Sequence, residues 1–446
     1  MSNAVTGDSS FYTGKICLAP MVRAGRTPLR LQALEYGADL VYTEEIVDQK
    51  LLSTTRKVND VLGTIDYVIE DDVVLRIAPE REGKKVVLQI GTNNGESAAR
   101  VAQMVGTDVA AIDVNMGCPK PFSISGGMGA ALLSQPDRVT DILSSLVATA
   151  QVPVSCKIRV LDEPSSTFNL LRTIERTGVA AIGVHGRRRD ERPHDSNRED
   201  EIREVVRVAS IPVIANGGSA EMSTLADVLA FKERTGASSV MVARAALSRP
   251  SILRAEGTLS MEEDIRRFID IACEYDECYT MTKYTVQRML GSEQERDPRG
   301  RATVQAGSVL EIARAWDMDE RHDHFRKLRS AQRGRKVEKD TDTGVEYIDV
   351  SFPMKRLKTA LSGAGTPKCA LTKLCEEQKA EKPIYECAQR PSDRRYEAKV
   401  RVLERRFASR IGQSNKKMAE QVAALAALIA LEARHRLDGE WEELCD

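Results

Sequence analysis

Short apolar runs rich in Val and Ile recur between positions 15 and 247, and each is followed by a stretch whose apolar residues have helical spacing. Strands buried on both faces read as continuous apolar runs, and their alternation with helices is typical of parallel βα units. The runs end at Pro20, Glu45, Ile90, Asn115, Val160, Gly186, Gly218 and Ala246. Eight consecutive units predict an α/β fold, a closed (β/α)8 TIM barrel over residues 1–248.

The pattern changes after Ser248. Residues 249–332 carry long amphipathic stretches with no strand-like run between them, which predicts an all-helical domain. Residues 333–349 are polar and charged, which is typical of a flexible linker.

The last part of the chain predicts the order α-β-β-β-α over residues 350–436. Its first helix opens with a Thr cap and Pro367, and its last helix is Ala-rich, with Ser414 as the expected cap. Residues 437–446 form an acidic tail.

Charge is distributed unevenly along the chain. Residues 351–436 hold 19 Lys and Arg against 9 Asp and Glu, a net charge of +10, whereas residues 1–350 hold 46 against 52, a net charge of −6. An appended basic module of this kind favours a polyanionic partner such as nucleic acid. The alternative is a basic face that is merely solvated.

No run approaches the roughly 20 apolar residues of a membrane span, and the first residues are polar. These features predict a cytoplasmic protein without a membrane partner. The nine Cys residues include no CxxC pair and no grouping with His, so we expect neither a metal site nor a disulfide framework.

Polar or conformationally special residues stand at or just after most of the predicted strand ends. In a barrel the functional groups lie at this end and in the loops that follow. Any one of these residues alone is more often structural than functional, but most of the strands end in this way. The residues at or just after these strand ends are Pro20, Met21, Glu45, Gln89, Asn115, Lys157, His185, Asn216 and Arg244.

The most specific local motif is NMGCP at residues 115–119, which precedes SGGMGAALL. The glycines of that segment permit a tightly turned loop over a ligand, and Cys118 would be presented on it. A thiol without a neighbouring base stays mostly protonated at neutral pH, which suits a general acid better than a nucleophile. The alternative is a cysteine packed beside a turn.

A second motif joins IANGGS after strand seven to VARAA at the end of strand eight. Barrels commonly bind phosphate at these positions, through backbone amides at Gly217 and Gly218 and here also through Arg244. Lys157 and His185 are expected at the same mouth, where they would donate hydrogen bonds to an electron-rich ring such as a flavin. The alternative for Lys157 is a Schiff-base lysine.

At these residues the sequence resembles the tRNA-dihydrouridine synthases. The resemblance is carried by LAPMVRAG, YTEE, LQIG, DVNMGCPKPFSISGGMGAALL, CKIR, VHGR, VIANGG and VMVARA. It covers the barrel and the helical domain. With the terminal module included, the chain looks like the eukaryotic tRNA-dihydrouridine(20) synthase branch, which couples the catalytic body to a C-terminal double-stranded-RNA-binding domain (dsRBD).

The resemblance implies a monomeric oxidoreductase that reduces uridine to 5,6-dihydrouridine in the D-loop of tRNA, at position 20. It implies FMN, reduced by NADPH, as the source of a hydride for C6 of uracil, with Cys118 giving a proton to C5 and Asn115 holding the uracil edge. Glu44 beside Glu45 leaves the choice between these two open. The residues implied for FMN are Pro20, Met21, Val22, Glu45, Gln89, Lys157, His185, Asn216, Gly217, Gly218, Ala243 and Arg244.

The resemblance also implies RNA-facing lysines in the terminal domain. These are Lys416 and Lys417 at the start of the last helix and Lys368 at the start of the first, and Lys355, Arg356 and Lys358 would extend the basic surface. The residues leave three other interpretations open: a non-catalytic RNA-binding or regulatory protein, a flavin oxidoreductase for a small molecule, and a Schiff-base lyase that uses Lys157.

Overall fold

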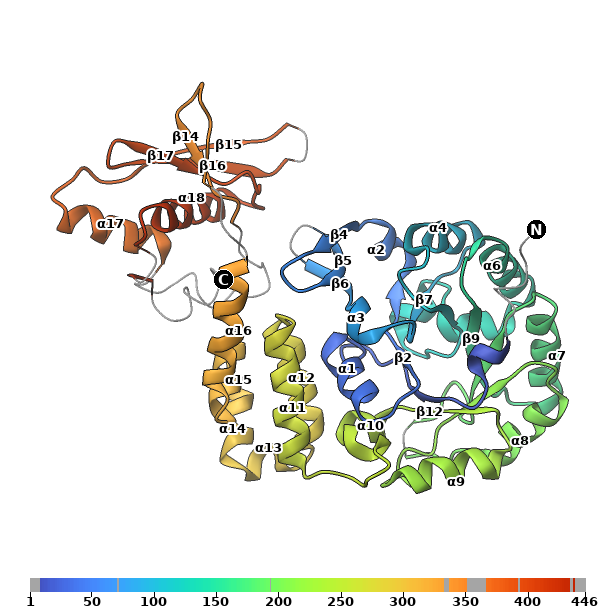
Figure 1. Ribbon diagram of the computed structural model, residues 1–446. Helices are drawn as coiled ribbons and strands as arrows, with labels where there is room; N and C mark the ends of the chain where they lie inside the picture. Colours follow the sequence, from blue (N-terminus) through green and yellow to red (C-terminus); the bar gives the residue numbers. More distant parts are fainter. Residues whose placement is uncertain are drawn as a thin grey trace. The chain divides into compact units, whose positions relative to one another are not determined.

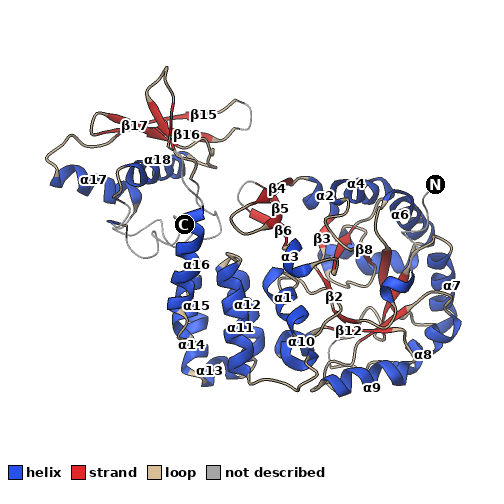
Figure 2. Cartoon of the chain, viewed as in Figure 1, coloured by secondary structure: helices blue, strands red, loops and turns tan. Residues whose placement is uncertain are grey.

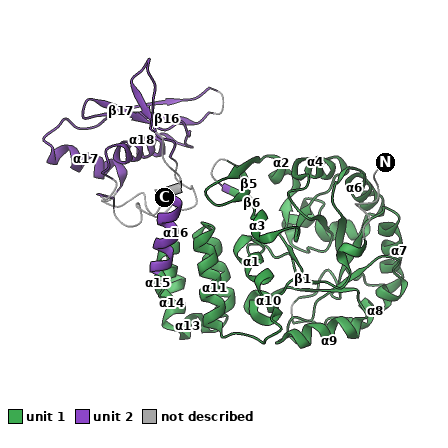
Figure 3. Cartoon of the chain, in the orientation of Figure 1, with its two compact units in different colours: residues 1–69, 73–318 green, residues 70–72, 319–446 purple. Residues whose placement is uncertain are grey.

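The computed structural model describes residues 9–69, 72–192, 194–332, 337–350, 366–391, 394–433 and 436–437. The chain divides into two compact units, residues 1–69 with 73–318 and residues 70–72 with 319–446 (Figure 3). The basic residues Lys355, Arg356 and Lys358 and the tail from residue 438 onward lie outside the described residues.

The first unit is built around a closed ring of eight parallel strands, as the sequence predicts. Neighbours follow the order β2-β1-β12-β11-β10-β9-β8-β7, and β2 pairs with β7 to close the ring. The strands are β1 (Ile16–Leu18), β2 (Leu40–Tyr42), β7 (Val86–Gly91), β8 (Ala111–Asn115), β9 (Val154–Arg159), β10 (Ala181–His185), β11 (Val213–Asn216) and β12 (Ser239–Val242). Every residue of β7, β8, β11 and β12 is buried, which explains their unbroken apolar character.

Helices surround this ring, as Figures 1 and 2 show. They are α1 (Thr27–Glu35), α4 (Gly95–Val105), α6 (Pro136–Thr149), α7 (Pro164–Glu175), α8 (Glu199–Val208), α9 (Leu225–Thr235) and α10 (Arg244–Ser248). Local sequence sets their starts: proline stands in the first turn of α1, α6 and α7, Asn94 caps α4, and Thr224 with Asp227 forms a capping box on α9. Short elements within the unit are η1 (Ser9–Tyr12), α2 (Asp48–Leu52), α3 (Pro79–Glu82), α5 (Pro121–Ser125), η2 (Gly129–Ser134) and η3 (Pro250–Leu253).

Two details of the barrel differ from the sequence-based prediction. Strand β12 ends at Val242, and Arg244 begins helix α10 instead of continuing the strand to Ala246. After the two-residue strand β3 (Ile46–Val47) the chain also forms an unpredicted three-stranded sheet of β4 (Thr55–Asn59), β5 (Thr64–Ile69) and β6 (Asp72–Ile77). The exposed face of β4 made this segment look like part of a polar connection.

The chain after the barrel is helical, which confirms the second part of the predicted architecture. The helices are α11 (Met261–Glu274), α12 (Tyr279–Leu290), α13 (Glu293–Arg296), α14 (Pro298–Gln305), α15 (Val309–Ala315) and α16 (Asp319–Gln332). Trp316 is fully buried after α15, and its indole N–H donates to Thr303 Oγ1 at 3.0 Å. A buried indole with a satisfied N–H fixes the packing of α14 and α15.

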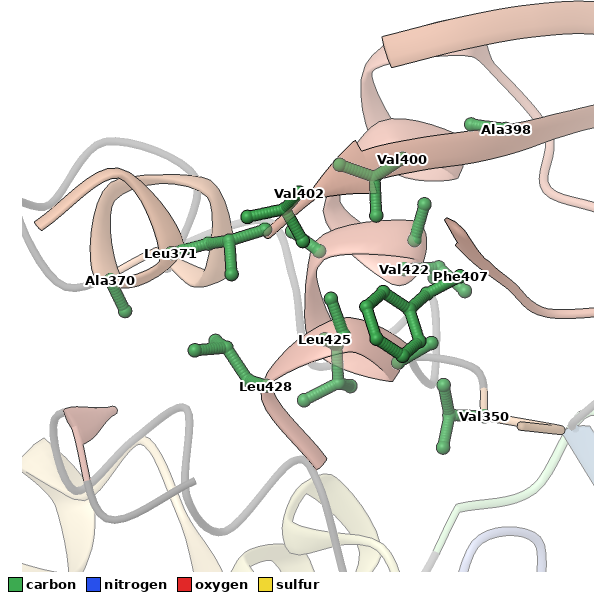
Figure 4. Close-up of a cluster of buried hydrophobic side chains, with 14 of the residues drawn as sticks. Val350, Ala370, Leu371, Ala398, Val400, Val402, Phe407, Val422, Leu425 and Leu428 are labelled. Atoms are coloured by element: carbon green, nitrogen blue, oxygen red, sulfur yellow. The ribbon is translucent and has the colours of Figure 1, made fainter. Parts of the chain in front are cut away.

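The second unit contains the predicted α-β-β-β-α order. Its elements are α17 (Pro367–Glu377), β15 (Ile384–Gln389), β16 (Tyr396–Val402), β17 (Arg405–Ala408) and α18 (Lys416–Ala430). Figure 4 shows the core, in which Leu371, Val400, Phe407, Val422 and Leu425 pack between the helices and the sheet. Each of these five side chains is at most 2% exposed, so the domain has a core of its own.

Two features of this unit correct the sequence-based picture. The cap of α18 is Asn415, whose side chain accepts the N–H of Met418, and not Ser414. The segment predicted as a linker contributes two strands, β13 (Glu338–Lys339) and β14 (Val345–Tyr347), and β14 pairs in parallel with β17. The sparse apolar residues of β14 hid it, although Val345 is 1% exposed.

Candidate active site and RNA-binding face

The strand register brings several predicted site residues together at one end of the barrel. Asn115 on β8 stands opposite Lys157 on β9, and His185 on β10 stands opposite Asn216 on β11. These positions are the last residues of β8, β10 and β11 or lie near the end of β9, so their side chains share the mouth formed by the carboxyl ends.

Cys118 lies on a loop that Asn115 and Arg159 hold in place. Asn115 Oδ1 accepts the backbone N–H of Gly117 at 3.0 Å and of Cys118 at 3.1 Å. The Arg159 guanidinium donates to the Gly117 carbonyl at 2.8 Å. The Asn115 oxygen is therefore occupied, and the Asn115 side chain also lies close to Glu45.

The glycine at position 129 lets the loop close tightly on Cys118. Gly129 has φ +56°, and a Cβ there would stand 2.7 Å from the Cys118 carbonyl oxygen and 2.4 Å from the Ser123 hydroxyl. The Ala130 N–H donates to the same carbonyl at 3.0 Å. Only glycine satisfies both the backbone angle and the contact.

The Cys118 thiol keeps its proton. Burial raises its pKa above the ordinary value and is the largest effect, and the charge of Glu45 acts in the same direction, whereas Lys120 and Ser123 act against them. Burial also raises the pKa of Glu45, and the neighbouring side chains of Asn115 and Cys118 act on it in the opposite direction. Neither carboxyl oxygen of Glu45 has a partner of hydrogen-bond geometry among the described residues. A buried carboxyl without a partner fits a site that is completed by a bound group.

Four basic residues surround His185 at the mouth of the barrel. Burial lowers the pKa of His185, and the charges of the four basic residues Lys157, Arg159, Arg187 and Arg244 lower it further, so the ring is neutral. His185 Nε2 lies 3.3 Å from Arg187 Nη1. Sequence analysis identified Lys157 and Arg244 but missed Arg159, the last residue of β9, and Arg187, two residues after β10.

Lys157 is the best preorganised cation of this group. Burial and the neighbouring Arg159 lower its pKa to about 8. Gly183 on β10 makes room for it, since a Cβ there would stand 3.1 Å from Lys157 Cγ. An amine held in a restricted space can donate hydrogen bonds to an electron-rich ligand. A Schiff-base lysine also needs a lowered pKa, so this property does not separate the two interpretations.

A buried hydrogen-bond network holds the side chain of Gln89. Its Nε2 donates to Asp113 Oδ2 at 2.8 Å, and Ser155 donates to Asp113 Oδ1 at 2.7 Å while accepting from Tyr12 at 3.0 Å. Burial raises the pKa of Asp113 to about 6. Asp113 was missed because a carboxylate in the middle of an apolar run gives no distinct signal, yet it positions the Gln89 amide.

The predicted phosphate-binding site, after β11, is formed mainly by backbone groups. Gly217 and Gly218 have φ +123° and +63°, so other residues would be strained there. Asn216 is 4% exposed and donates to the Met241 carbonyl at 2.9 Å, which ties β11 to β12 and leaves its amide nitrogen engaged. Arg244 lines a surface pocket of about 260 Å³ with Ser219, Ala220, Met222, Ser223, Ala245, Ser248, Arg249 and Ile252.

The remaining predicted residues lie on the same rim. Met21 is half-buried and Val22 is 38% exposed in the loop after β1, where Pro20 precedes them. Ala243 is the residue before α10. Among the described residues no group of three or more His, Cys, Asp or Glu is arranged to hold a metal ion, and no helix is long and apolar enough to cross a membrane.

The three predicted RNA-facing lysines of the second unit differ in their environment. Lys416 and Lys417 are exposed in the first turn of α18. Lys368 instead forms a 2.5 Å ion pair with Glu420 and lies 4.4 Å from the centre of the Tyr385 ring. Its charge is therefore largely compensated within the domain.

The fold and the mouth define a class, a (β/α)8-barrel protein with a cysteine on a mouth loop beside a cluster of basic residues. The family model of dihydrouridine synthase (Dus) matches residues 17–299, and that of the double-stranded RNA binding motif matches residues 367–431. The chain belongs to the dihydrouridine synthase family and joins its catalytic domain to a C-terminal dsRBD.

Two curated relatives illustrate this membership. The tRNA-dihydrouridine(20) synthase of Schizosaccharomyces pombe is 36% identical over 351 residues, which cover 76% of this chain and 71% of the relative. That of Saccharomyces cerevisiae is 37% identical over 300 residues, which cover 63% of this chain and 78% of the relative. A crystal structure of a tRNA-dihydrouridine(20) synthase dsRBD domain is 34% identical and covers 20% of this chain and 90% of that one, with a TM-score of 0.18.

Proposed function

We propose that this enzyme reduces uridine to 5,6-dihydrouridine in the D-loop of tRNA, at position 20. Family membership and the names of the two fungal relatives support the reaction and the position. The observation that carries the proposal is the place of Cys118 on a loop that Asn115 and Arg159 hold at the barrel mouth, next to the basic cluster around His185.

The residues of the mouth fit FMN. Four cations around a neutral His185 suit an anionic ligand, and the Gly217–Gly218 turn with Arg244 suits its phosphate. Lys157, Gln89 and His185 would hold the ring, with Pro20, Met21, Val22 and Ala243 beside them and Glu45 accepting a donor. When bound and reduced by NADPH, FMN supplies the hydride for C6 of uracil.

The chain provides the proton and the positioning. Cys118 donates its thiol proton to C5, so that a hydride and a proton add across the C5=C6 bond. The thiolate that remains is stabilised by the positive charge of Lys120 and of Arg159. The amide nitrogen of Asn115 donates to a uracil carbonyl, while its oxygen keeps the thiol loop in place.

The terminal domain supplies binding energy remote from the reaction. A uridine must leave its stack to enter the mouth, at a cost of a few kcal/mol that contacts elsewhere offset. We assign this role to residues 350–436, through Lys416 and Lys417, with residues 1–248 as catalytic domain and 249–332 as helical domain. A monomeric, cytoplasmic enzyme remains the expectation for the whole chain.

The visible spectrum of the purified protein and the dihydrouridine map of tRNA test this function. We expect a yellow protein with a flavin spectrum that forms dihydrouridine at position 20 only when NADPH is added. A colourless protein that takes up no FMN contradicts the assignment. Borohydride trapping of a carbonyl substrate on Lys157 would instead support a Schiff-base lyase.

A further inference from the structure

The loop after β1 and helix α12 form a rigid corner on the rim of the barrel mouth. Arg26, at the end of this loop, contacts Glu44 Oε1 after β2 at 3.2 Å and Glu277 Oε2 at 3.0 Å. Glu277 stands two residues before Tyr279, the first residue of α12, and is 7% exposed. A buried bridge of this kind fixes the relative position of the two segments because breaking it would leave a carboxylate unpaired.

Arg23 is held in an unusual conformation at this corner. Its φ is +70°, which is uncommon for a residue with a side chain, and its backbone N–H donates to Glu44 Oε2 at 2.9 Å. Glu44 thus holds both Arg23 and Arg26. Strained backbone that the surrounding contacts maintain is commonly found at functional positions.

Two guanidinium groups converge on one aromatic ring of α12. The Cζ atoms of Arg23 and Arg288 lie 5.8 Å and 5.4 Å from the centre of the Tyr284 ring. Tyr284 and Arg288 are four residues apart and therefore neighbours on one helix face. Both arginines are exposed, and within the described part of the chain neither forms an ion pair with a carboxylate. We call Arg23, Tyr284 and Arg288 the arginine–tyrosine cluster.

We propose that the arginine–tyrosine cluster binds the phosphodiester backbone of the RNA strand that leads the target uridine into the barrel. The proposal rests on the proposed function and adds a second RNA contact to it, distinct from the dsRBD. Two adjacent cations without an internal counterion repel each other, and a polyanion relieves that repulsion. Planar guanidinium groups suit phosphate oxygens, and the ring preorganises both of them.

The position of the cluster on the rim agrees with this role. Arg23 follows Met21 and Val22 in the loop at the carboxyl end of β1, the end at which Cys118 lies. A nucleotide that enters the mouth brings its flanking phosphates to the rim. Contact at this point would orient the strand, whereas the dsRBD lysines would recognise a duplex region.

The test compares the full-length Arg23→Ala/Arg288→Ala double variant with an Arg207→Ala/Arg296→Ala control. The control removes the same charge from two exposed arginines whose ion pairs are local, to Glu204 and Glu293. Binding of an unmodified tRNA transcript is measured between 50 and 300 mM salt. We expect the cluster variant to bind about tenfold more weakly, with a salt slope lower by about 2, and the control to match the unsubstituted enzyme.

Other measurements separate the failure of this inference from failure of the proposed function. FMN content, melting temperature and NADPH oxidation without tRNA should be equal in all three proteins, and the KM for tRNA should rise more than kcat falls in the cluster variant. Equal tRNA affinity and equal salt slope in the two double variants overturn the inference, even when the enzyme forms dihydrouridine. If the unsubstituted enzyme neither binds tRNA nor forms dihydrouridine, the proposed function fails and the inference fails with it.

Discussion

Asn115 accepts the backbone N–H of Cys118 through its side-chain oxygen at 3.1 Å, so the last residue of β8 sets the place of the thiol. The same oxygen accepts the Gly117 N–H. The oxygen of this amide group supports the loop, and we propose that its nitrogen contacts the substrate. Substitution can separate these two roles.

Asn115→Asp should keep the loop and lose the substrate contact. An aspartate oxygen still accepts the two N–H groups, but the donor for a uracil carbonyl is gone. We expect unchanged FMN binding and a fall in kcat/KM of about 10²-fold, since a buried polar partner is left without its donor. Asn115→Leu removes both tasks and serves as the comparison. Equal activity of Asn115→Asp and the unsubstituted enzyme would refute the uracil contact.

Cys118→Ala should abolish proton donation without disturbing the mouth. General acid catalysis contributes roughly 10²- to 10⁴-fold, so dihydrouridine formation should fall by that factor while the flavin spectrum and tRNA affinity stay the same. Cys156→Ala, at a fully buried cysteine on β9, is the control for loss of a thiol. Full turnover by Cys118→Ala would remove this residue as the acid.

Gly129→Ala should displace the thiol loop. The added Cβ meets the Cys118 carbonyl at 2.7 Å and adopts φ +56°, whereas Gly291 has φ +54° and nothing within 4 Å of an added Cβ. Both substitutions strain the backbone by about 1 kcal/mol, but only the first also clashes. We expect a loss of activity for Gly129→Ala beyond its change in melting temperature, and normal activity for Gly291→Ala.

FMN affinity should decrease as the pH rises above about 8. The pKa of Lys157 is lowered to about 8 in the folded protein, so its positive charge is present below that pH and is lost above it. Titration of FMN fluorescence quenching between pH 7 and 9.5 measures this change. Lys157→Arg keeps its charge throughout and should flatten the profile. An unchanged slope in that variant would show that another group is responsible.

The terminal-domain lysines should contribute unequally to RNA binding. Lys416 and Lys417 are exposed, so Lys416→Ala/Lys417→Ala should weaken tRNA binding several-fold and lower the salt slope by about 2. Lys368→Ala should have a smaller effect, because Glu420 already neutralises that lysine. A larger loss for Lys368→Ala than for the double variant would reverse this ranking.

The eight barrel strands could be predicted because each is a buried apolar run. The candidate site residues were proposed because polar side chains recur where these strands end, and the strand register brings several of them together. This reasoning singled out Cys118 and Asn115, but it could not predict the hydrogen bond between them. Arg159, Arg187 and Asp113 could not be singled out, since their importance depends on which side chains the barrel closure brings near them.

The sheet of β4, β5 and β6 was missed for a different reason. Residues 55–58 of β4 are exposed, and a strand without a buried face lacks the alternation that identifies one, although its neighbours β5 and β6 are partly buried. Likewise, β14 is only three residues long, and its place is decided by pairing with a distant strand. Such tertiary pairings leave little trace in the local sequence.

The parallel pairing of β14 with β17 has a practical consequence for dissecting the protein. A fragment that starts at residue 350 lacks β14, so the backbone groups of β17 that pair with β14 would be exposed. An unpaired edge strand of this kind can pair with other copies of the fragment. Fragments of the RNA-binding domain that begin before residue 337 keep β14 and should resist aggregation up to a higher protein concentration.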